Sequence, residues 1–535
     1  MEKRTLYAII LSVSILYAWG VLFSKKPVVP PPASVENVEN KEVANQPLFA
    51  EKKPKPLEQS DPSLLKGSLP EEIQTITTNK LKVEFSSLGG KIKSMMLKQY
   101  DAHLPIDRLF AIKEFAQDVF QLKNLSPTGA SFISRKKGVT VVRRYEVAED
   151  DYLIQASVEI YNESSMSKQI ELSIEGLVLD ISRLDNDQFA RDQSLFEYSI
   201  SSASGISRKS NAFKFSAKEN INKKEMLNWA GFRDRYFCAL IKPRFSVEEF
   251  SAEALGNKSL AINFGKKMFE IPANGKIILE ATILYSPQEL FLLKKYNEGF
   301  EGIFSFSRFG LVDVISKGLY YLTHTLYKFI PSPGIILIIL AFVIYGLTYP
   351  LTVRGMLSMK KMQSVQPEVT ALREKYKNNP QKIQQETMEL YKKYKINPFG
   401  GCFPLILQMP IFISIYQVLW RSVLFKGSGF LWIKDLAEPD RLFILPYSLP
   451  VIGNEINILP VLMSITMFFQ QKVSSQGMST ADPAQASQQK IMMVFFPIFL
   501  GFVFYKFSSG LALYFTIFYV LSTFTQLKMS KMAKA

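Results

Sequence analysis

The fold is decided by two uncharged apolar runs, GIILIILAFVIYGLTYPLTV (residues 334–353) and GCFPLILQMPIFISIYQVLW (residues 401–420). Each is long enough to cross about 30 Å of hydrocarbon as a helix. The segment between them, residues 354–400, holds ten Lys or Arg against four Glu. Short loops rich in Lys and Arg stay on the cytoplasmic side of a bilayer, so this segment orients the whole chain.

Further apolar runs predict that the chain crosses the membrane several times. Of its 535 residues, 47% are hydrophobic and 21% are charged, and uncharged runs cover residues 5–23, 456–471, 491–505 and 507–527. Together with the first two runs they predict six transmembrane helices. The runs at 456–471 and 491–505 are short. They predict either a thinned bilayer beside a hydrated surface, or spans whose terminal lysines snorkel to the interface.

The part before these spans predicts an anchor, a linker and a β domain. Residues 5–23 exceed a usual signal-peptide core, and Ala18-Trp19-Gly20 is a poor cleavage site, so we favour an uncleaved anchor. Residues 27–70 are rich in proline and polar residues, which is typical of an extended linker. Short β-rich runs then alternate with turn residues, as in a large all-β sandwich. These runs are 81–85, 140–147, 152–161, 169–177, 260–264 and 276–284.

An amphipathic helix is predicted over residues 307–329. Its apolar residues follow 3/4 spacing and are Val312, Ile315, Leu319, Leu322, Leu326 and Phe329. Such a helix lies in the membrane interface, or it is a packing helix of the β domain.

The basic segment predicts a helical hairpin. Met362, Val365, Val369, Leu372 and Tyr376 form one helical stripe. A second stripe of the same kind contains Ile383, Thr387, Leu390, Tyr391 and Tyr394. Residues 377–380 form a turn between the two stripes. Two such helices pack as an antiparallel pair with a basic outer surface. The alternative is a charged loop whose only task is to orient the chain.

Charge elsewhere agrees with this orientation. Residues 423–455 hold three Lys or Arg against four acids, which suits the outside, whereas Lys528, Lys531 and Lys534 suit the inside. Both termini are then cytoplasmic and the β domain is outside.

The predicted segments are an anchor (1–26), a linker (27–70), the β domain (71–300), an interfacial helix (301–333), a span (334–353), the cytoplasmic hairpin (354–400), a span (401–424), an outer loop (425–455), a span (456–473), a cytoplasmic loop (474–489), two spans (490–506 and 507–527) and a cytoplasmic tail (528–535).

Composition argues against several classes of protein. The net charge of +16 is concentrated next to apolar spans, so anionic lipid is a better partner for it than nucleic acid. The two cysteines, Cys238 and Cys402, and the two histidines, His103 and His324, form no pattern of metal ligands or catalytic residues. We therefore expect no cofactor, no metal and no enzyme activity.

The spans contain no Asp or Glu, which transporters driven by ions usually carry. Their polar residues are neutral, and as a set they predict a hydrated groove. Taken singly, each Ser or Thr is more simply an interhelical hydrogen bond. The groove candidates from this pattern are Thr348, Gln408, Ser414, Gln417, Thr466 and Gln470.

Several motifs resemble those of the YidC/Oxa1/Alb3 family of membrane protein insertases. The resemblance is strongest over residues 305–530. Its motifs are YPLT (349–352), NPFGGCFPL (397–405), QMPIF (408–412), LWIKDL (431–436), QKIM (489–492) and SGL (509–511) with LY (513–514). The β domain resembles the periplasmic domain of Gram-negative members through FSSLGGKI (85–92), WAGF (229–232) and YF (236–237).

The resemblance implies an insertase and chaperone of the bacterial inner membrane. Its fold would be a five-helix core with a periplasmic β-super-sandwich similar to sugar mutarotases. Its partners would be nascent membrane proteins, the Sec translocon and the ribosome. Substrates would enter a hydrophilic groove open to cytoplasm and lipid, without any nucleotide.

One position departs from the family pattern. The family usually has an arginine four residues before the YPLT motif, where this chain has Tyr345. Arg354 is the next arginine along the chain and is either a boundary charge or a partial substitute. The resemblance also adds Phe515, with Tyr514 beside it, to the groove. The rival predictions are a channel or transporter and, for the β domain, a sugar-acting enzyme, for which His103 alone is poor equipment.

Overall fold

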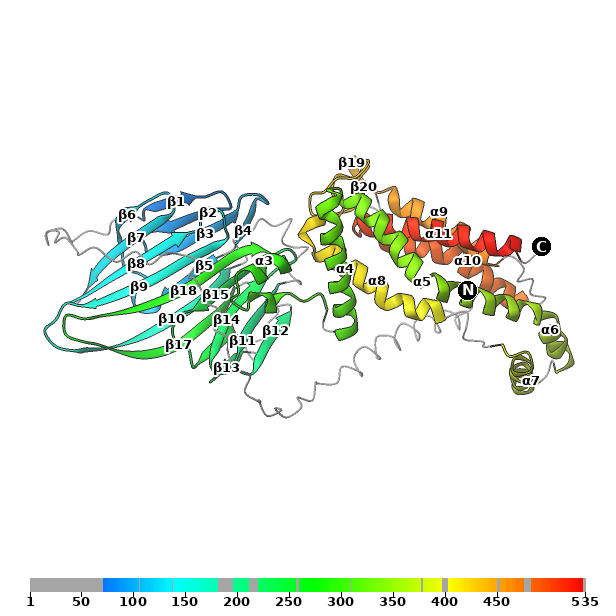
Figure 1. The fold of residues 1–535 in the computed structure, drawn as a ribbon, viewed down its shortest axis with the longest axis horizontal. Helices are drawn as coiled ribbons and strands as arrows, with labels where there is room; N and C mark the ends of the chain where they lie inside the picture. Colours follow the sequence, from blue (N-terminus) through cyan, green and yellow to red (C-terminus); the bar gives the residue numbers. More distant parts are fainter. Residues whose placement is uncertain are drawn as a thin grey trace. The chain divides into compact units, whose positions relative to one another are not determined.

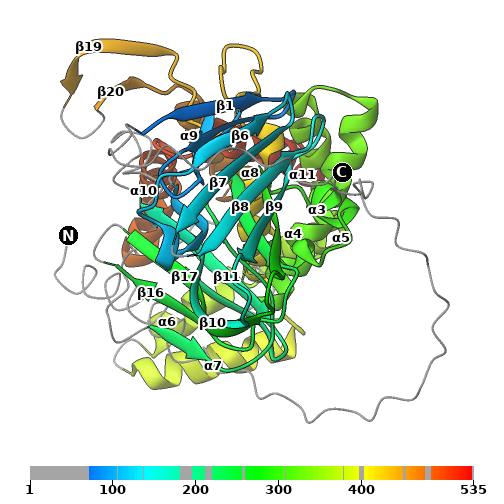
Figure 2. The same cartoon turned by 90° about the vertical axis from the view of Figure 1, so that its left-hand side faces the viewer.

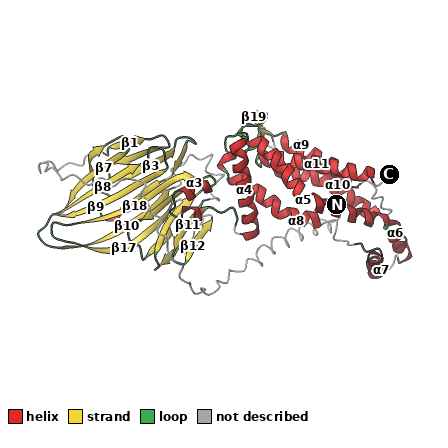
Figure 3. Cartoon of the chain, viewed as in Figure 1, coloured by secondary structure: helices red, strands yellow, loops and turns green. Residues whose placement is uncertain are grey.

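The structure is a computed structural model. It describes residues 71–104, 106–136, 138–180, 196–210, 220–255, 259–307, 309–376, 379–396, 403–449, 453–475 and 483–532. The predicted N-terminal anchor and linker lie outside these residues. Strands fill the described chain up to residue 287 and helices dominate after it, apart from one hairpin (Figure 3).

The β domain consists of antiparallel sheets (Figures 1 and 2). In the described residues one sheet has four strands, one has five and one has nine. In sheet order the first contains β1 (Ile73–Thr77), β2 (Leu81–Ser86), β3 (Lys91–Leu97) and β4 (Ala102–Leu104). The second contains β13 (Ile221–Lys223), β16 (Phe250–Ala254), β17 (Ser259–Ile271), β10 (Lys168–Asp180) and β5 (Ile106–Ile112). The third contains β12 (Gly205–Ser210), β11 (Glu197–Ser202), β14 (Leu227–Arg233), β15 (Phe237–Pro243), β18 (Lys276–Pro287), β9 (Leu153–Asn162), β8 (Val139–Val147), β7 (Gly129–Lys136) and β6 (Gln121–Leu125).

Apolar side chains that alternate with polar ones along these strands form the core. Val141 of β8 pairs with Ile160 of β9, which pairs with Ile277 of β18, so that apolar side chains meet across three strands. The largest fully buried side chains of the domain include Trp229, Tyr145 and Phe85. Each predicted β-rich run coincides with an observed strand, so the prediction of an all-β domain is confirmed.

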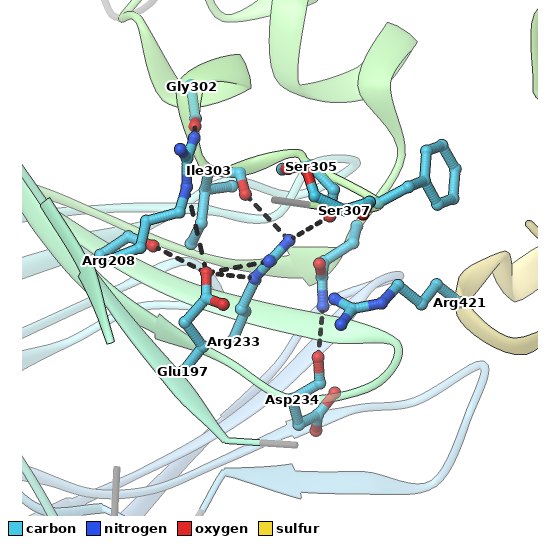
Figure 4. A network of polar contacts seen from close by, with 12 residues as sticks. Glu197, Arg208, Arg233, Asp234, Gly302, Ile303, Ser305, Ser307 and Arg421 are labelled. Atoms are coloured by element: carbon cyan, nitrogen blue, oxygen red, sulfur yellow. Dashed lines mark hydrogen bonds and ion pairs between the residues drawn. The ribbon is translucent and has the colours of Figure 1, made fainter. Parts of the chain in front are cut away.

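The chain leaves the β domain through a short connection, α3 (Leu290–Lys295) and the 3-10 turn η6 (Phe300–Ile303). A buried ion pair holds this connection (Figure 4). Arg233 donates from Nε and Nη2 to Glu197 Oε1, at 2.9 and 2.8 Å. Its Nη1 donates to the carbonyl oxygens of Ile303 and Ser305, at 3.0 and 2.9 Å. The exit of the chain is therefore fixed to strands β11 and β14.

A second arginine, Arg235, joins the β14–β15 turn to the helical region. Its guanidinium donates to Trp420 O at 2.8 Å, Ala437 O at 3.0 Å and Glu438 Oε1 at 3.3 Å. It also lies over the rings of Tyr236 and Trp420. Because Trp420 lies in the last turn of the helix Phe403–Arg421 and Ala437 lies in the loop after it, this contact marks the end of the bundle that faces the β domain.

The helical region follows. Its helices are α4 (Gly310–Phe329), α5 (Pro333–Ser364), α6 (Gln366–Lys375), α7 (Pro380–Lys393), α8 (Phe403–Arg421), α9 (Leu459–Ser475), α10 (Pro483–Phe504) and α11 (Ser509–Met532), with the turn η8 (Val423–Phe425) and the hairpin β19 (Phe443–Leu449) and β20 (Gly453–Ile456). Helix α11 packs along α9 and α5, α10 packs on α9, and α8 packs along α4.

Two of the described helices, α5 and α11, are apolar over a length that can cross a membrane. The end of α10, Met493–Phe504, is apolar but shorter. The count of six spans therefore stays a prediction. Helix α5 does not end at the predicted boundary, residue 353: it continues through Pro350 and Arg354 to Ser364. Proline costs the helix one hydrogen bond there without breaking it.

The amphipathic helix is confirmed as α4, and the predicted stripe is confirmed in part: Val312 is buried and Leu319 and Leu322 pack against the core, whereas Phe329 is exposed and the most buried face is turned toward Ser316, Tyr320 and Thr323. Val312, Ser316, Tyr320 and Thr323 are buried. The Ser414 hydroxyl of α8 is 2.7 Å from Pro410 O of its own helix and 3.2 Å from Val312 O of α4. Ser316 donates to Ser414 O at 3.4 Å, since small polar residues let the two helices approach closely. Other apolar side chains of this segment stay exposed, namely Phe309, Leu311, Val314 and Phe329.

The predicted helical hairpin is present as α6 and α7, which contact each other. Val365 and Val369, both in the predicted stripe, are buried. Asn379 caps α7 by accepting a hydrogen bond from Lys382 N at 3.1 Å, and Pro380 takes the first helical position. Tyr394 donates to Glu368 at 2.6 Å and ties the end of α7 back to α6.

Candidate functional site

The candidate residues Tyr345 and Gln408 lie at similar depth in the bundle. Tyr345 is 12 residues beyond Pro333, where α5 begins, and Gln408 is 13 residues before Arg421, where α8 ends. At 1.5 Å per residue both lie about 18–20 Å from the end that faces the β domain. A hydrocarbon core is about 30 Å thick, so a bundle that spans it along α5 and α8 would hold both side chains well inside it. Arg354 is 21 residues beyond Pro333, about 32 Å away, at the opposite boundary.

A chain of contacts joins these two residues across three helices. The Gln408 side chain lies beside the Tyr514 hydroxyl. The Tyr514 ring stacks on Phe518 at 6.2 Å, and Phe518 meets the Tyr345 ring edge-to-face at 5.5 Å. The Tyr345 hydroxyl oxygen in turn is 2.7 Å from Thr525 Oγ1. We call Gln408, Tyr514, Tyr345, Thr525 and the adjacent Gln526 the inner polar cluster, which extends along α11 over the 12 residues, about 18 Å, from Tyr514 to Gln526.

Three polar atoms of this cluster are buried and make no hydrogen bond of good geometry to the described residues, although Gln408 and the Tyr514 hydroxyl lie side by side. They are Gln408 Nε2, the Tyr514 hydroxyl and Gln526 Oε1. An unsatisfied buried polar atom costs about 1–3 kcal/mol. Native proteins rarely leave such atoms without water or a ligand to bond them. The inner polar cluster is therefore equipped to bind hydrogen-bonding groups that enter the bundle.

An aromatic cluster lies next to it, toward the β domain. Phe412 of α8, Phe504 of α10 and Phe515 of α11 contact one another, with ring centroids 5.3–6.2 Å apart. Phe507 adds a further contact to Phe504 at 5.2 Å. Phe515 also touches Tyr514 at 5.2 Å, so the two clusters are continuous. We call Phe412, Phe504, Phe507 and Phe515 the aromatic cluster.

The structure does not bring every predicted groove residue to this place. The hydroxyls of Thr348 and Thr466 bond to carbonyl oxygens of their own helices. Ser414 faces α4, as described above. Gln417 accepts a hydrogen bond from Arg421 at 3.1 Å near the β-domain end of α8. Gln470 is half-buried on α9.

The predicted residues that do come together are Tyr345, Gln408, Tyr514 and Phe515. The sequence analysis missed Thr525 and Gln526, as well as the phenylalanines that surround Phe515. A signal for the first two was available, because Ser522, Thr525 and Gln526 follow 3/4 spacing in the last apolar run. They therefore share one face of α11, and Ser522 and Gln526 are buried.

Lys506 and Lys528 stand next to the clusters in sequence, but both are exposed. The first cation of α5 is Arg354, which is exposed, and the one cation of α8 is Arg421, its last residue. Figure 4 places the Arg421 side chain beside the Arg233–Glu197 network. The described residues hold no group of His, Cys, Asp or Glu that could bind a metal ion.

The β domain has a pocket of its own, with a volume of about 380 Å³. Its lining includes Tyr100, Tyr152, Asp151, Glu289 and Lys295. Asp151 is bonded by Lys295 at 2.9 Å and by the Tyr296 hydroxyl, whereas burial raises the pKa of the Glu289 carboxyl. His103 is exposed and does not line the pocket. The one histidine of the domain is thus absent from this pocket.

Known proteins resemble the chain in both regions. Residues 325–535 match the family described as 60Kd inner membrane protein, and residues 114–322 match the YidC periplasmic domain. The chain is 30% identical to the membrane protein insertase YidC of Pelobacter propionicus over 99% of both chains. It is 28% identical to that of a Janthinobacterium species over 86% of this chain and 84% of the relative. A crystal structure of an active YidC insertase is similar with 17% identity and a TM-score of 0.39, over 85% of this chain and 92% of that one.

Proposed function

Because the chain belongs to the YidC family of membrane protein insertases, we propose that it inserts its substrates past the inner polar cluster. The observation that supports this path is the set of unpartnered buried atoms on Gln408, Tyr514 and Gln526. A substrate that enters between α5, α8 and α11 from the α6–α7 side would offer these atoms main-chain groups and water.

The proposed mechanism lowers the cost of moving a polar tail. A charged side chain at the centre of a helix costs about 2.5–3.5 kcal/mol on insertion scales. Neutral donors and acceptors half-way across the bilayer replace part of the lost hydration and shorten the apolar path. The substrate's own apolar segment supplies the driving force, at about 25 cal/mol for each Å² removed from water. No nucleotide or cofactor is required.

We further propose the topology that the charge pattern predicts. The chain then has six spans in the inner membrane, both termini in the cytoplasm and residues 71–300 in the periplasm. The basic hairpin of α6 and α7 would meet the ribosome or the nascent chain together with anionic lipids. The Sec translocon would be a partner for longer substrates.

The first prediction removes the free donor of the inner polar cluster. In Gln408→Leu, insertion of a single-span substrate with a short polar tail is expected to slow about fivefold, because one hydrogen bond of about 1 kcal/mol is lost. Tyr514→Phe is expected to act in the same direction. The measurement is protease protection of the tail in vesicles that contain only the purified chain.

Thr466→Val is the matched control for this prediction. The Thr466 hydroxyl donates to Met463 O at 2.8 Å within its own helix, so its loss leaves the substrate path unchanged. Equal rates for Gln408→Leu and the parent protein would contradict the proposed path. Failure of the parent protein itself to insert the substrate would contradict the insertase function.

The second prediction concerns the charge of the substrate tail. Tyr345 stands where the family usually has an arginine, and Arg354 is the first cation of α5 beyond the inner polar cluster. Arg354→Ala is expected to slow insertion of acidic-tailed substrates several-fold and to leave neutral-tailed ones unchanged, because a single exposed charge acts only on charges nearby. Insertion is compared for Asp, Asn and Lys versions of one tail. Equal slowing of all three versions would rule out a charge effect.

A further inference from the structure

The β19–β20 hairpin exposes large apolar side chains at the end of the bundle that faces the β domain. Phe443, Ile444 and Tyr447 are 62%, 64% and 61% exposed. The hairpin projects sideways from the bundle near the start of α9 (Figures 1 and 2). Between residues 443 and 456 the chain carries a single charge, Glu455, and its carboxylate is 2.9 Å from Arg441 Nε. Such a ribbon is unusual on a surface that only meets water.

The base of the hairpin is held rigidly at the helix ends. Asp440 is buried and accepts hydrogen bonds from Ile458 N at 2.9 Å and Leu459 N at 3.1 Å, so it caps the start of α9. Tyr505, just after α10, donates from its hydroxyl to Glu455 O at 2.9 Å. The hairpin therefore lies at the same depth as these helix ends.

The same helix ends define the membrane boundary. Tyr505 stands four residues before Ser509, the first residue of α11, which is apolar over the length of a span. The loop after α8 meets this point as well, because Ser509 N donates to Glu438 O at 2.8 Å. The hairpin thus lies at the level where α11 enters the bilayer, on the side of the β domain.

We propose that the β19–β20 hairpin lies in the lipid at this boundary and anchors the bundle in the leaflet that faces the β domain. Phe443 and Ile444 are neighbours in one strand and so point to opposite faces of the ribbon. A docked protein would cover one face, whereas surrounding lipid covers both. The open strand edges keep the ribbon at the headgroup boundary, because unpaired backbone groups are excluded from hydrocarbon. Pro446 removes one such donor.

The proposal is tested by placing one fluorescent label at a time. Cys238 and Cys402 are replaced by Ala and Ser, and an environment-sensitive dye is attached to Ile444→Cys in the full chain in lipid vesicles. Asn274→Cys, in an exposed turn of the β domain, is the control for water. Phe502→Cys, 57% exposed on α10, is the control for lipid. Each variant is first shown to unfold at the same temperature as its parent.

Nitroxides attached to the lipid are expected to quench most of the label at residue 444, as at residue 502, while aqueous iodide quenches mainly the label at residue 274. Iodide quenching at residue 444 equal to that at residue 274 would overturn the proposal. Protection of residue 444 from both quenchers would also overturn it, in favour of contact with a second copy of the chain. Tyr447→Cys repeats the test on the same strand in case Ile444→Cys fails to fold.

Discussion

Glu197→Ala is expected to destabilise the β domain by about 3–5 kcal/mol, because it leaves the Arg233 guanidinium buried without its carboxylate. Both side chains are nearly inaccessible, with 4% of Arg233 and 7% of Glu197 exposed. Two of the four hydrogen bonds of Arg233 end on Glu197 Oε1. The remaining two hold the Ile303 and Ser305 carbonyls, so the connection to α4 is expected to loosen as well.

The measurement is chemical unfolding of the full chain in lipid discs, followed by the fluorescence of the buried Trp229. Lys93→Ala is the control, since Lys93 pairs with Glu71 on the surface, where both side chains are about 40% exposed. Exposed pairs contribute about 0–1 kcal/mol. Similar losses in the two variants would show that the Arg233–Glu197 pair contributes no more than a surface pair. The double variant Glu197→Ala with Arg233→Met is expected to recover stability only in part, because the two carbonyls lose their donor.

The elements of this fold that could be predicted from sequence are those encoded by local pattern. Strand β9 and helix α4 follow from alternation and from 3/4 spacing, and turn residues bound the strands. Helix α5 shows the limit of such reasoning. Its apolar run ends at residue 353, but the helix continues to Ser364, since apolarity marks the membrane and not the end of the helix.

The contacts that join distant segments could not be predicted. Glu197 and Arg233 are 36 residues apart, and Arg235 and Trp420 are 185 residues apart. Nothing in the local pattern indicates either pair. The partners of the serine and threonine hydroxyls in the predicted spans could not be predicted for another reason. Whether a serine or threonine bonds to its own helix or points toward a neighbour depends on its rotamer and on the helix rotation. Thr466 donates to Met463 O of its own helix, whereas the Ser414 hydroxyl lies between Pro410 O of its own helix, at 2.7 Å, and Val312 O of α4, at 3.2 Å.

Removing the aromatic cluster is expected to make the membrane leak protons. In the proposed topology the inner polar cluster places polar atoms inside the bilayer, so water that reaches them from the α6–α7 side has only the rest of the path to cross. The rings of Phe412, Phe504 and Phe515 pack together on the β-domain side of Gln408, in that remaining path. An apolar packed region excludes water, whereas a roomy space beside polar groups admits it. Phe412→Ala with Phe515→Ala deletes two of the four rings of the cluster and is expected to raise proton flux several-fold.

The chain offers a matched control for this experiment. Phe495 and Phe499 of α10 stack at 5.8 Å and are 51% and 45% exposed, so they form an aromatic pair that faces outward. Phe495→Ala with Phe499→Ala removes the same number of rings from the same bundle without opening its interior. The decay of an imposed pH gradient is followed with a trapped dye in vesicles of each variant. Equal decay in the two double variants would mean that the aromatic cluster does not close the path. Faster decay only in the Phe412 and Phe515 variant would place the barrier between the inner polar cluster and the β-domain side.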